Sequence, residues 1–159
     1  MALQALPYLL VLHLIGLTIM AGTTLVDFVT FRQFWALYAQ NKQKALPVME
    51  VQAKFPRLLA TGIILLLVTG ISMMAVTRGV FGEQLWFRIK MVIVVLIIIK
   101  GLAVGRRQAM KLRRLITTDT GDSDTQQKVK SLRQGIALFH ISQLLLFIVI
   151  IILSTFRFN

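Results

Sequence analysis

The chain contains no cysteine. Disulfide bonds, thiolate-ligated iron–sulfur clusters and covalent haem attachment through a Cys-x-x-Cys-His motif are therefore excluded. The chain also has only six Asp or Glu residues and two His residues, so we expect neither a carboxylate-built metal site nor a long relay of acidic side chains. Charged residues make up 15% of the 159 residues, whereas soluble domains carry about 25%. This shortage of charge favours a membrane protein over a soluble domain.

Long apolar runs, separated by short basic stretches, dominate the rest of the chain. Crossing the hydrocarbon core of a bilayer takes about 20 mostly apolar residues in one helix. The runs predict an all-α integral membrane protein, a four-helix bundle in which residues 1–159 form a single transmembrane domain. The first basic residue is Arg32, well after the first run, which favours a retained helix over a signal peptide. The predicted spans are residues 5–28, 58–76, 85–105 and 136–155.

The third span is predicted from its length. Its uninterrupted apolar run, Met91–Ile99, is too short to cross a core of about 30 Å at about 1.5 Å per residue. A spanning helix must therefore begin near Leu85 or Trp86. That start places Arg88 and Lys90 inside the bilayer or at its edge, so Lys90 is predicted to be an intramembrane cation.

The net charge of +12 comes from basic residues at the ends of the apolar runs. This placement fits anionic lipids at the cytoplasmic face, at about 1 kcal/mol per Lys or Arg, better than nucleic acid. Most of these residues fall in the loops that join spans one to two and three to four. Because basic loops stay in the cytoplasm, we expect a multi-pass protein of the bacterial inner membrane with both termini periplasmic. Pro47, in the first of these loops, is predicted to separate the tail of the first helix from the approach to the second.

Ionisable side chains inside a bilayer are costly, and each is a functional candidate. His13 is predicted about 12 Å from the outer end of its span and His140 about 6 Å from the cytoplasmic end, so about 12 Å separates them in depth. Two axial ligands of one iron lie only about 4 Å apart. Lys90 lies at a depth that overlaps that of His13, and burial favours the neutral amine, which can ligate iron. We therefore predict His13 and Lys90 as the axial ligands of one haem iron, with His140 as a candidate for a second site.

Two further residues are candidates for binding the cofactor. Gly16, one turn from His13, would let a flat macrocycle approach the helix backbone, although small residues also let plain helices pack closely. Arg88, close to Lys90, would pair with a carboxylate such as a haem propionate. Simpler roles stay open, namely an interhelical hydrogen bond for His13 and an extension of Lys90 to the outer headgroups.

Three polar residues are expected near the cytoplasmic side. Lys100 is predicted to extend its ammonium group to the headgroups. His140, with Gln143 one turn further on, is predicted to make a packing hydrogen bond. A second haem or a quinone pocket is the alternative for this pair.

Two segments carry a resemblance to a known family. Val11–Gly16 (VLHLIG) resembles the opening helix of HemJ-type protoporphyrinogen oxidases and of the wider CopD-like membrane proteins, and Leu85–Lys90 (LWFRIK) resembles their Trp-Leu-His-x-Lys-Leu segment. The resemblance implies a haem b held by His13 and Lys90, a porphyrin substrate and the six-electron oxidation of protoporphyrinogen IX. Arg88 stands where HemJ-type enzymes usually carry His, and electron transfer to or from a quinone or a partner protein is the alternative redox function.

The competing class of function is not redox. The chain would then be a structural or assembly subunit of a larger membrane complex, a homo-oligomer, or a CopD-like metal-handling protein. Copper handling is less favoured, because the chain has neither cysteine nor a dense cluster of Met and His to supply soft ligands.

Overall fold

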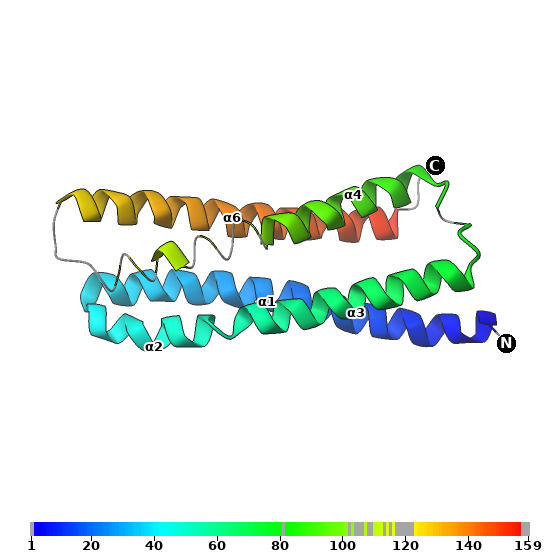
Figure 1. Cartoon of the computed structure of the whole chain (residues 1–159), viewed down its shortest axis with the longest axis horizontal. Coiled ribbons are helices and arrows are strands. Elements are labelled where there is room, and N and C mark those ends of the chain that lie inside the picture. Colours follow the sequence, from blue (N-terminus) through cyan, green and yellow to red (C-terminus); the bar gives the residue numbers. More distant parts are fainter. Residues whose placement is uncertain are drawn as a thin grey trace. The chain divides into compact units, whose positions relative to one another are not determined.

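The structure, a computed structural model, describes residues 2–80, 82–101, 103, 107, 110–112, 114, 116 and 123–156. Every secondary-structure element in this part of the chain is helical, which confirms the all-α prediction. Figure 1 shows a short 3-10 helix, η1 (Ala2–Ala5), followed by α1 (Leu6–Gln40), α2 (Lys42–Gln52), α3 (Phe55–Val76), α4 (Leu85–Lys100) and α6 (Ser123–Thr155).

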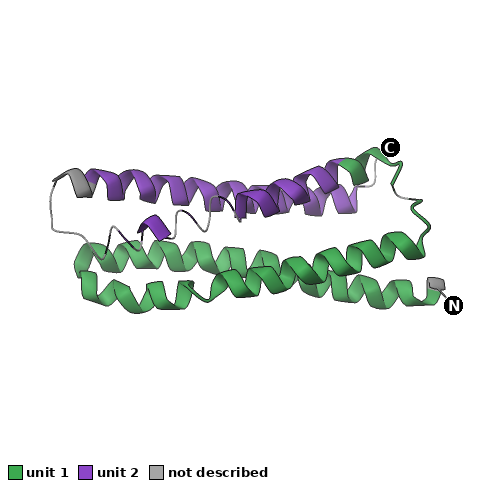
Figure 2. Ribbon diagram, viewed as in Figure 1, with its two compact units in different colours: residues 1–88, 159 green, residues 89–158 purple. Residues whose placement is uncertain are grey.

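The chain divides into two compact units, residues 1–88 and residues 89–158 (Figure 2). Unit 1 contains α1, α2, α3 and the first turn of α4. Unit 2 contains the rest of α4 and α6.

Unit 1 is a long helical hairpin in which α1 packs against α2 and α3 (Figure 1). The chain reverses at Asn41, which has an extended backbone and accepts a hydrogen bond from the Gln43 backbone N–H at 2.8 Å, capping α2. Asn is a favoured N-cap because its side chain satisfies one of the unpaired N–H groups of the first turn. Both arms, Leu6–Gln40 and Lys42–Val76, are 35 residues long. Each arm is therefore about 52 Å long, which exceeds a bilayer core of about 30 Å.

The predicted break at Pro47 is wrong, because Pro47 lies inside α2. The two arms are separated at Asn41, and a short turn at Ala53 and Lys54 divides α2 from α3. A proline in a helix removes one backbone hydrogen bond. Here Gln43, whose carbonyl would have received that bond, is exposed, so water can replace the missing donor.

Small residues bring α1 and α3 into close contact. A methyl group added at Gly62 would lie 3.1 Å from the Gly16 carbonyl oxygen and 3.1 Å from the Met20 backbone nitrogen. Gly16, Met20 and Thr24 are buried along one side of α1, and Gly62 and Thr69 are buried on α3. Apolar side chains gain little from leaving lipid for a protein interior, so helices in membranes associate through close packing of this kind.

The second half of α1 carries a cluster of aromatic side chains. Phe31 and Phe34 each meet Trp35 edge to face, with ring centroids 6.0 and 5.2 Å apart, and Tyr38 stacks on Phe34 at 5.9 Å. Alongside this half of α1, α2 buries Ala45, and the Gln52 side-chain amide donates to the Asp27 carboxylate at 3.2 Å. These contacts hold together the part of the hairpin where charged residues begin.

Hydrogen bonds join α4 to α6 within unit 2. The Lys100 ammonium donates to the Ser142 hydroxyl at 2.7 Å, and the Gln143 side-chain amide approaches the Ile97 carbonyl at 3.5 Å. The later residue of α4, Lys100, pairs with the earlier residue of α6, Ser142, and Ile97 pairs with Gln143. This order indicates that α4 and α6 run antiparallel.

Within the described residues, three helical segments are long and apolar enough to cross a membrane. Only 17%, 11% and 33% of their most apolar stretches are buried, so most of this apolar surface needs lipid around it. The remaining predicted span, residues 85–105, begins at Leu85 as expected, and its predicted end lies outside the described residues. The three segments are Leu6–Gln40, Lys42–Val76 and Gln127–Thr155.

Candidate functional site

His13 is hydrogen-bonded between helices. It lies half-buried on α1, and its Nδ1 is 2.8 Å from the hydroxyl oxygen of Thr69, a buried residue of α3. The interhelical hydrogen bond that the sequence left open as a role for His13 is therefore present, with Thr69 as the partner.

The Thr69 hydroxyl determines which nitrogen of His13 carries a proton. A threonine hydroxyl has one proton to donate, and it points to the Leu65 carbonyl at 2.6 Å, with the Leu66 carbonyl at 3.3 Å. The Thr69 oxygen must then accept, so Nδ1 of His13 donates. In the neutral imidazole the lone pair therefore lies on Nε2. Metal-ligating histidines are held in this way, with one ring N–H donated to a protein oxygen and the other nitrogen directed to the metal.

The backbone of α3 also contacts the His13 ring. A methyl group placed at Gly70 would lie 3.6 Å from Cε1 of His13, at ordinary van der Waals distance. The ring is thus positioned by a hydroxyl at Thr69 and by the backbone of the next residue.

The small surface of Gly16 faces α3. A methyl group at Gly16 would lie 3.2 Å from Cγ of Leu66 and 3.4 Å from the Gly62 carbonyl oxygen. Of the two roles open to Gly16, helix packing is the one that these contacts favour, and the approach of a macrocycle stays a prediction.

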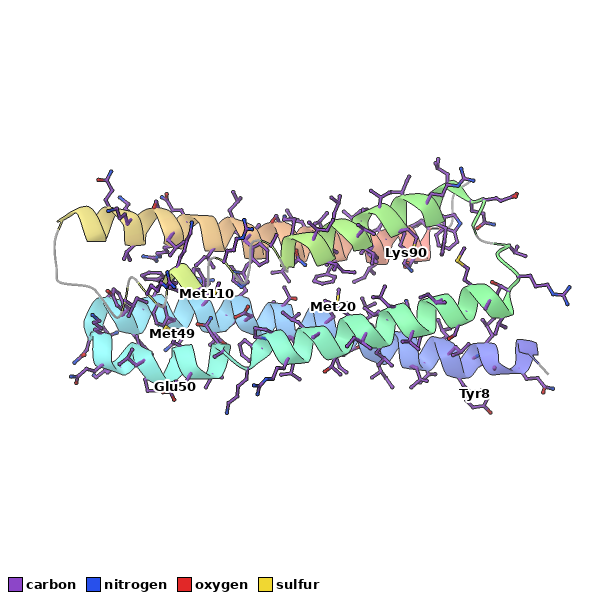
Figure 3. The ribbon with its side chains drawn as sticks, viewed as in Figure 1. Tyr8, Met20, Met49, Glu50, Lys90 and Met110 are labelled. Atoms are coloured by element: carbon purple, nitrogen blue, oxygen red, sulfur yellow. The ribbon has the colours of Figure 1, made fainter. Side chains whose placement is uncertain are left out.

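Arg88 and Lys90 lie two residues apart near the start of α4. Arg88 is exposed, and its Nε donates to the Gly82 carbonyl at 3.1 Å, which fixes the guanidinium against the preceding loop. Lys90 is half-buried (Figure 3). His13 belongs to unit 1 and Lys90 to unit 2, so their pairing rests on the predicted depths of the two residues.

His140 is almost fully buried on α6, with 5% of its surface exposed. Its Nδ1 donates to the Ile136 carbonyl at 2.8 Å, one turn earlier, and its ring meets Phe139 edge to face at 5.5 Å. The predicted packing hydrogen bond is present, made within α6.

Lys100 makes a contact that the sequence did not predict, and its extension to the headgroups stays a prediction. Its ammonium donates to the Ser142 hydroxyl, and Ser142 in turn donates to the Phe139 carbonyl at 2.9 Å. The Ser142 hydroxyl stabilises the ammonium group at the end of the apolar run of α4 by accepting one of its N–H groups. Thr69 and Ser142, which hold His13 and Lys100, were missed because neither residue type is unusual in a membrane helix.

No group of three or more His, Cys, Asp or Glu side chains in the described part of the chain could hold a metal ion. A haem iron needs only one or two side chains, because the porphyrin supplies the other ligands. The donors available to a metal here are thus single side chains such as His13.

Residues 7–158 match a protein family described as predicted integral membrane proteins, DUF2269. The chain belongs to this family. Membership of DUF2269 agrees with the exposed apolar surfaces of the helices and establishes an integral membrane protein. No curated protein and no solved structure matches the chain. The likeness to HemJ-type and CopD-like proteins therefore remains a resemblance between short segments.

Proposed function

We propose that this DUF2269 protein binds haem b in the bacterial inner membrane and acts in electron transfer or oxidation. In this proposal the chain crosses the membrane four times, with both termini periplasmic and the basic loops cytoplasmic. His13 and Lys90 would hold the haem through its iron.

The hydrogen bond from His13 Nδ1 to Thr69 is the single observation that carries the proposal. It fixes the ring at half-burial in the tautomer whose Nε2 can ligate a metal. A histidine that only packs two helices together could make this hydrogen bond through either ring nitrogen. A ligand needs one nitrogen to be held and the other to carry the lone pair.

Each side chain has a distinct role in this proposal. His13 would hold the iron through Nε2, and Thr69, which accepts from Nδ1, would orient the ring and raise the basicity of Nε2. Arg88, already fixed by Gly82, offers its remaining guanidinium N–H groups to a propionate. When bound, haem b supplies a centre that gains and loses one electron. Lys90 is assigned on its predicted depth and on the resemblance of Leu85–Lys90 to the HemJ-type segment.

The redox partner separates two versions of the proposal. A HemJ-like version takes electrons from protoporphyrinogen IX, and the other exchanges them with a quinone or a partner protein. Restoring haem synthesis to a strain that lacks its own protoporphyrinogen oxidase would identify the first version. A haem-loaded protein that fails to restore it supports the second.

One observation favours a non-redox alternative, a structural or assembly subunit. The bond between His13 and Thr69 already links α1 to α3, which is sufficient reason for a histidine at this position. In that case the protein would contain no haem.

Haem content tests the proposal. The protein is purified in detergent from cells supplied with a haem precursor, and bound haem is measured per chain as its pyridine complex. We expect about one haem in the unmodified protein and in His140→Ala, and almost none in His13→Ala. Equal haem in His13→Ala, or none in any of the three, would contradict the proposal.

A further inference from the structure

Gln143 on α6 has an unsatisfied polar atom. The residue is 6% exposed, and its side-chain oxygen, Oε1, is buried without a hydrogen-bond partner in the described structure. Its amide nitrogen reaches the Ile97 carbonyl only at 3.5 Å, the outer limit of a hydrogen bond. Leaving a buried acceptor unpaired is unfavourable, so Oε1 needs a donor.

Two other polar residues lie near Gln143 in the chain or along the contact between α4 and α6. Lys100 donates to Ser142, the neighbour of Gln143, at 2.7 Å, and an ammonium has three N–H groups. His140 lies one turn from Gln143 on the same face of α6 and is also buried. The contact thus combines an acceptor that lacks a donor, Gln143 Oε1, with the Lys100 ammonium, which lies one turn of α4 after Ile97.

The apolar surroundings restrict what can supply the donor. Gln143 lies seven residues after Ile136, near which the apolar run of α6 begins, or about 10 Å into that run. Ile97 is 2% exposed. A ligand must therefore arrive through lipid, offer an O–H group to Oε1 and present an oxygen to the Lys100 ammonium.

We propose that the contact between α4 and α6 binds the head group of a lipid-soluble hydroquinone, with Gln143 Oε1 accepting from one of its hydroxyls. The other oxygen of the ring takes a hydrogen bond from Lys100. The oxidised quinone has no O–H group, so it binds more weakly than the reduced form. This site is separate from His13 and its binding does not require haem, although a hydroquinone would also suit the proposed redox function as an electron donor.

The test measures affinity for decylubiquinol and for decylubiquinone, by anaerobic titration calorimetry on the full-length protein in detergent. We expect saturable binding of the reduced form, about fivefold tighter than that of the oxidised form, since the reduced form makes one more hydrogen bond, worth about 1 kcal/mol. Gln143→Leu should reduce this preference to about one. Gln134→Leu, which changes an exposed glutamine of the same helix, should keep it.

Two further results bear on the site. His13→Ala should still prefer the reduced form, which distinguishes failure of the haem proposal from failure of this one. Lys100→Met should weaken the binding of both the reduced and the oxidised form, because both carry an oxygen that can accept from the ammonium. The same preference in Gln143→Leu as in the unmodified protein, or no saturable binding of the reduced form, would overturn the proposal and leave Gln143 as a packing residue.

Discussion

His13 on α1 and Thr69 on α3 are joined by a 2.8 Å hydrogen bond in which the imidazole is the donor. The direction follows from the 2.6 Å bond that the Thr69 hydroxyl itself donates to the Leu65 carbonyl. Haem ligation and a purely structural role predict different consequences when this pair is altered. If the bond only joins the two helices, His13 and Thr69 contribute equally to stability. If His13 ligates a haem and Thr69 orients it, loss of the two side chains has different effects on the haem.

Thr69→Val and His13→Ala should therefore give different results. Both remove one interhelical hydrogen bond, worth about 0.6 kcal/mol in a membrane protein, so both should lower thermal stability slightly. Thr69→Val should keep its haem but raise its reduction potential, because the histidine becomes a weaker electron donor to the iron. Potentiometric titration measures the change.

Thr69→Ser provides the control, since serine restores the hydroxyl. It should return the potential to that of the unmodified protein. If Thr69→Val has an unchanged potential, or loses its haem as completely as His13→Ala does, the positioning role of Thr69 is wrong.

The contact between Gly16 and Gly62 predicts a steric effect. Gly62→Ala places a methyl group 3.1 Å from the backbone of Gly16 and Met20, and the helices must separate to admit it. Crowding of this kind costs about 1–3 kcal/mol. Unfolding in a mixed-detergent titration should show that loss.

Gly22→Ala is the matched control on α1, because no atom from elsewhere in the described part of the chain lies within 4 Å of the added methyl group. It should leave the free energy of unfolding unchanged or raise it by up to about 1 kcal/mol, the helix-propensity difference between Gly and Ala. Equal losses in the two variants would mean that α1 and α3 do not pack through these glycines.

The proposed topology can be tested by labelling, because the chain has no cysteine of its own. Gln43→Cys places a thiol near the reversal at Asn41, and Glu83→Cys places one between α3 and α4; both positions are exposed. A membrane-impermeant maleimide should label Glu83→Cys in spheroplasts and should label Gln43→Cys only after lysis. Labelling of both from the same side would show that α3 does not cross the membrane.

The sequence predicts the fold best where the length of an apolar run decides where a helix must begin. A helix that starts at Leu85 follows from the need for about 20 residues in a span, and the structure has that start. The break near Pro47 was mispredicted because proline is a strong local signal. Asn41, which reverses the chain, is an ordinary polar residue that acts through its N-cap bond.

The partner of His13 could have been predicted in part. Thr69 lies seven residues before Val76, the end of α3, and His13 lies eight residues after Ala5, so antiparallel helices bring them to similar depth. Which side of each helix faces the other is a separate question. Helix α1 is apolar on nearly all sides through its first 20 residues, so no amphipathic pattern shows its packing face. Only the positions of Gly16 and Gly62 in three dimensions settle it.

The visible spectrum of the purified protein, oxidised and then reduced with dithionite, tests the haem proposal most directly. The proposal predicts a sharp Soret band and resolved α and β bands on reduction, as for a low-spin iron with two axial ligands. Lys90→Met should change this spectrum while keeping the haem, and His13→Ala should lose it. A protein without a Soret band, even from cells supplied with a haem precursor, would contradict the proposal and leave a structural subunit as the better account.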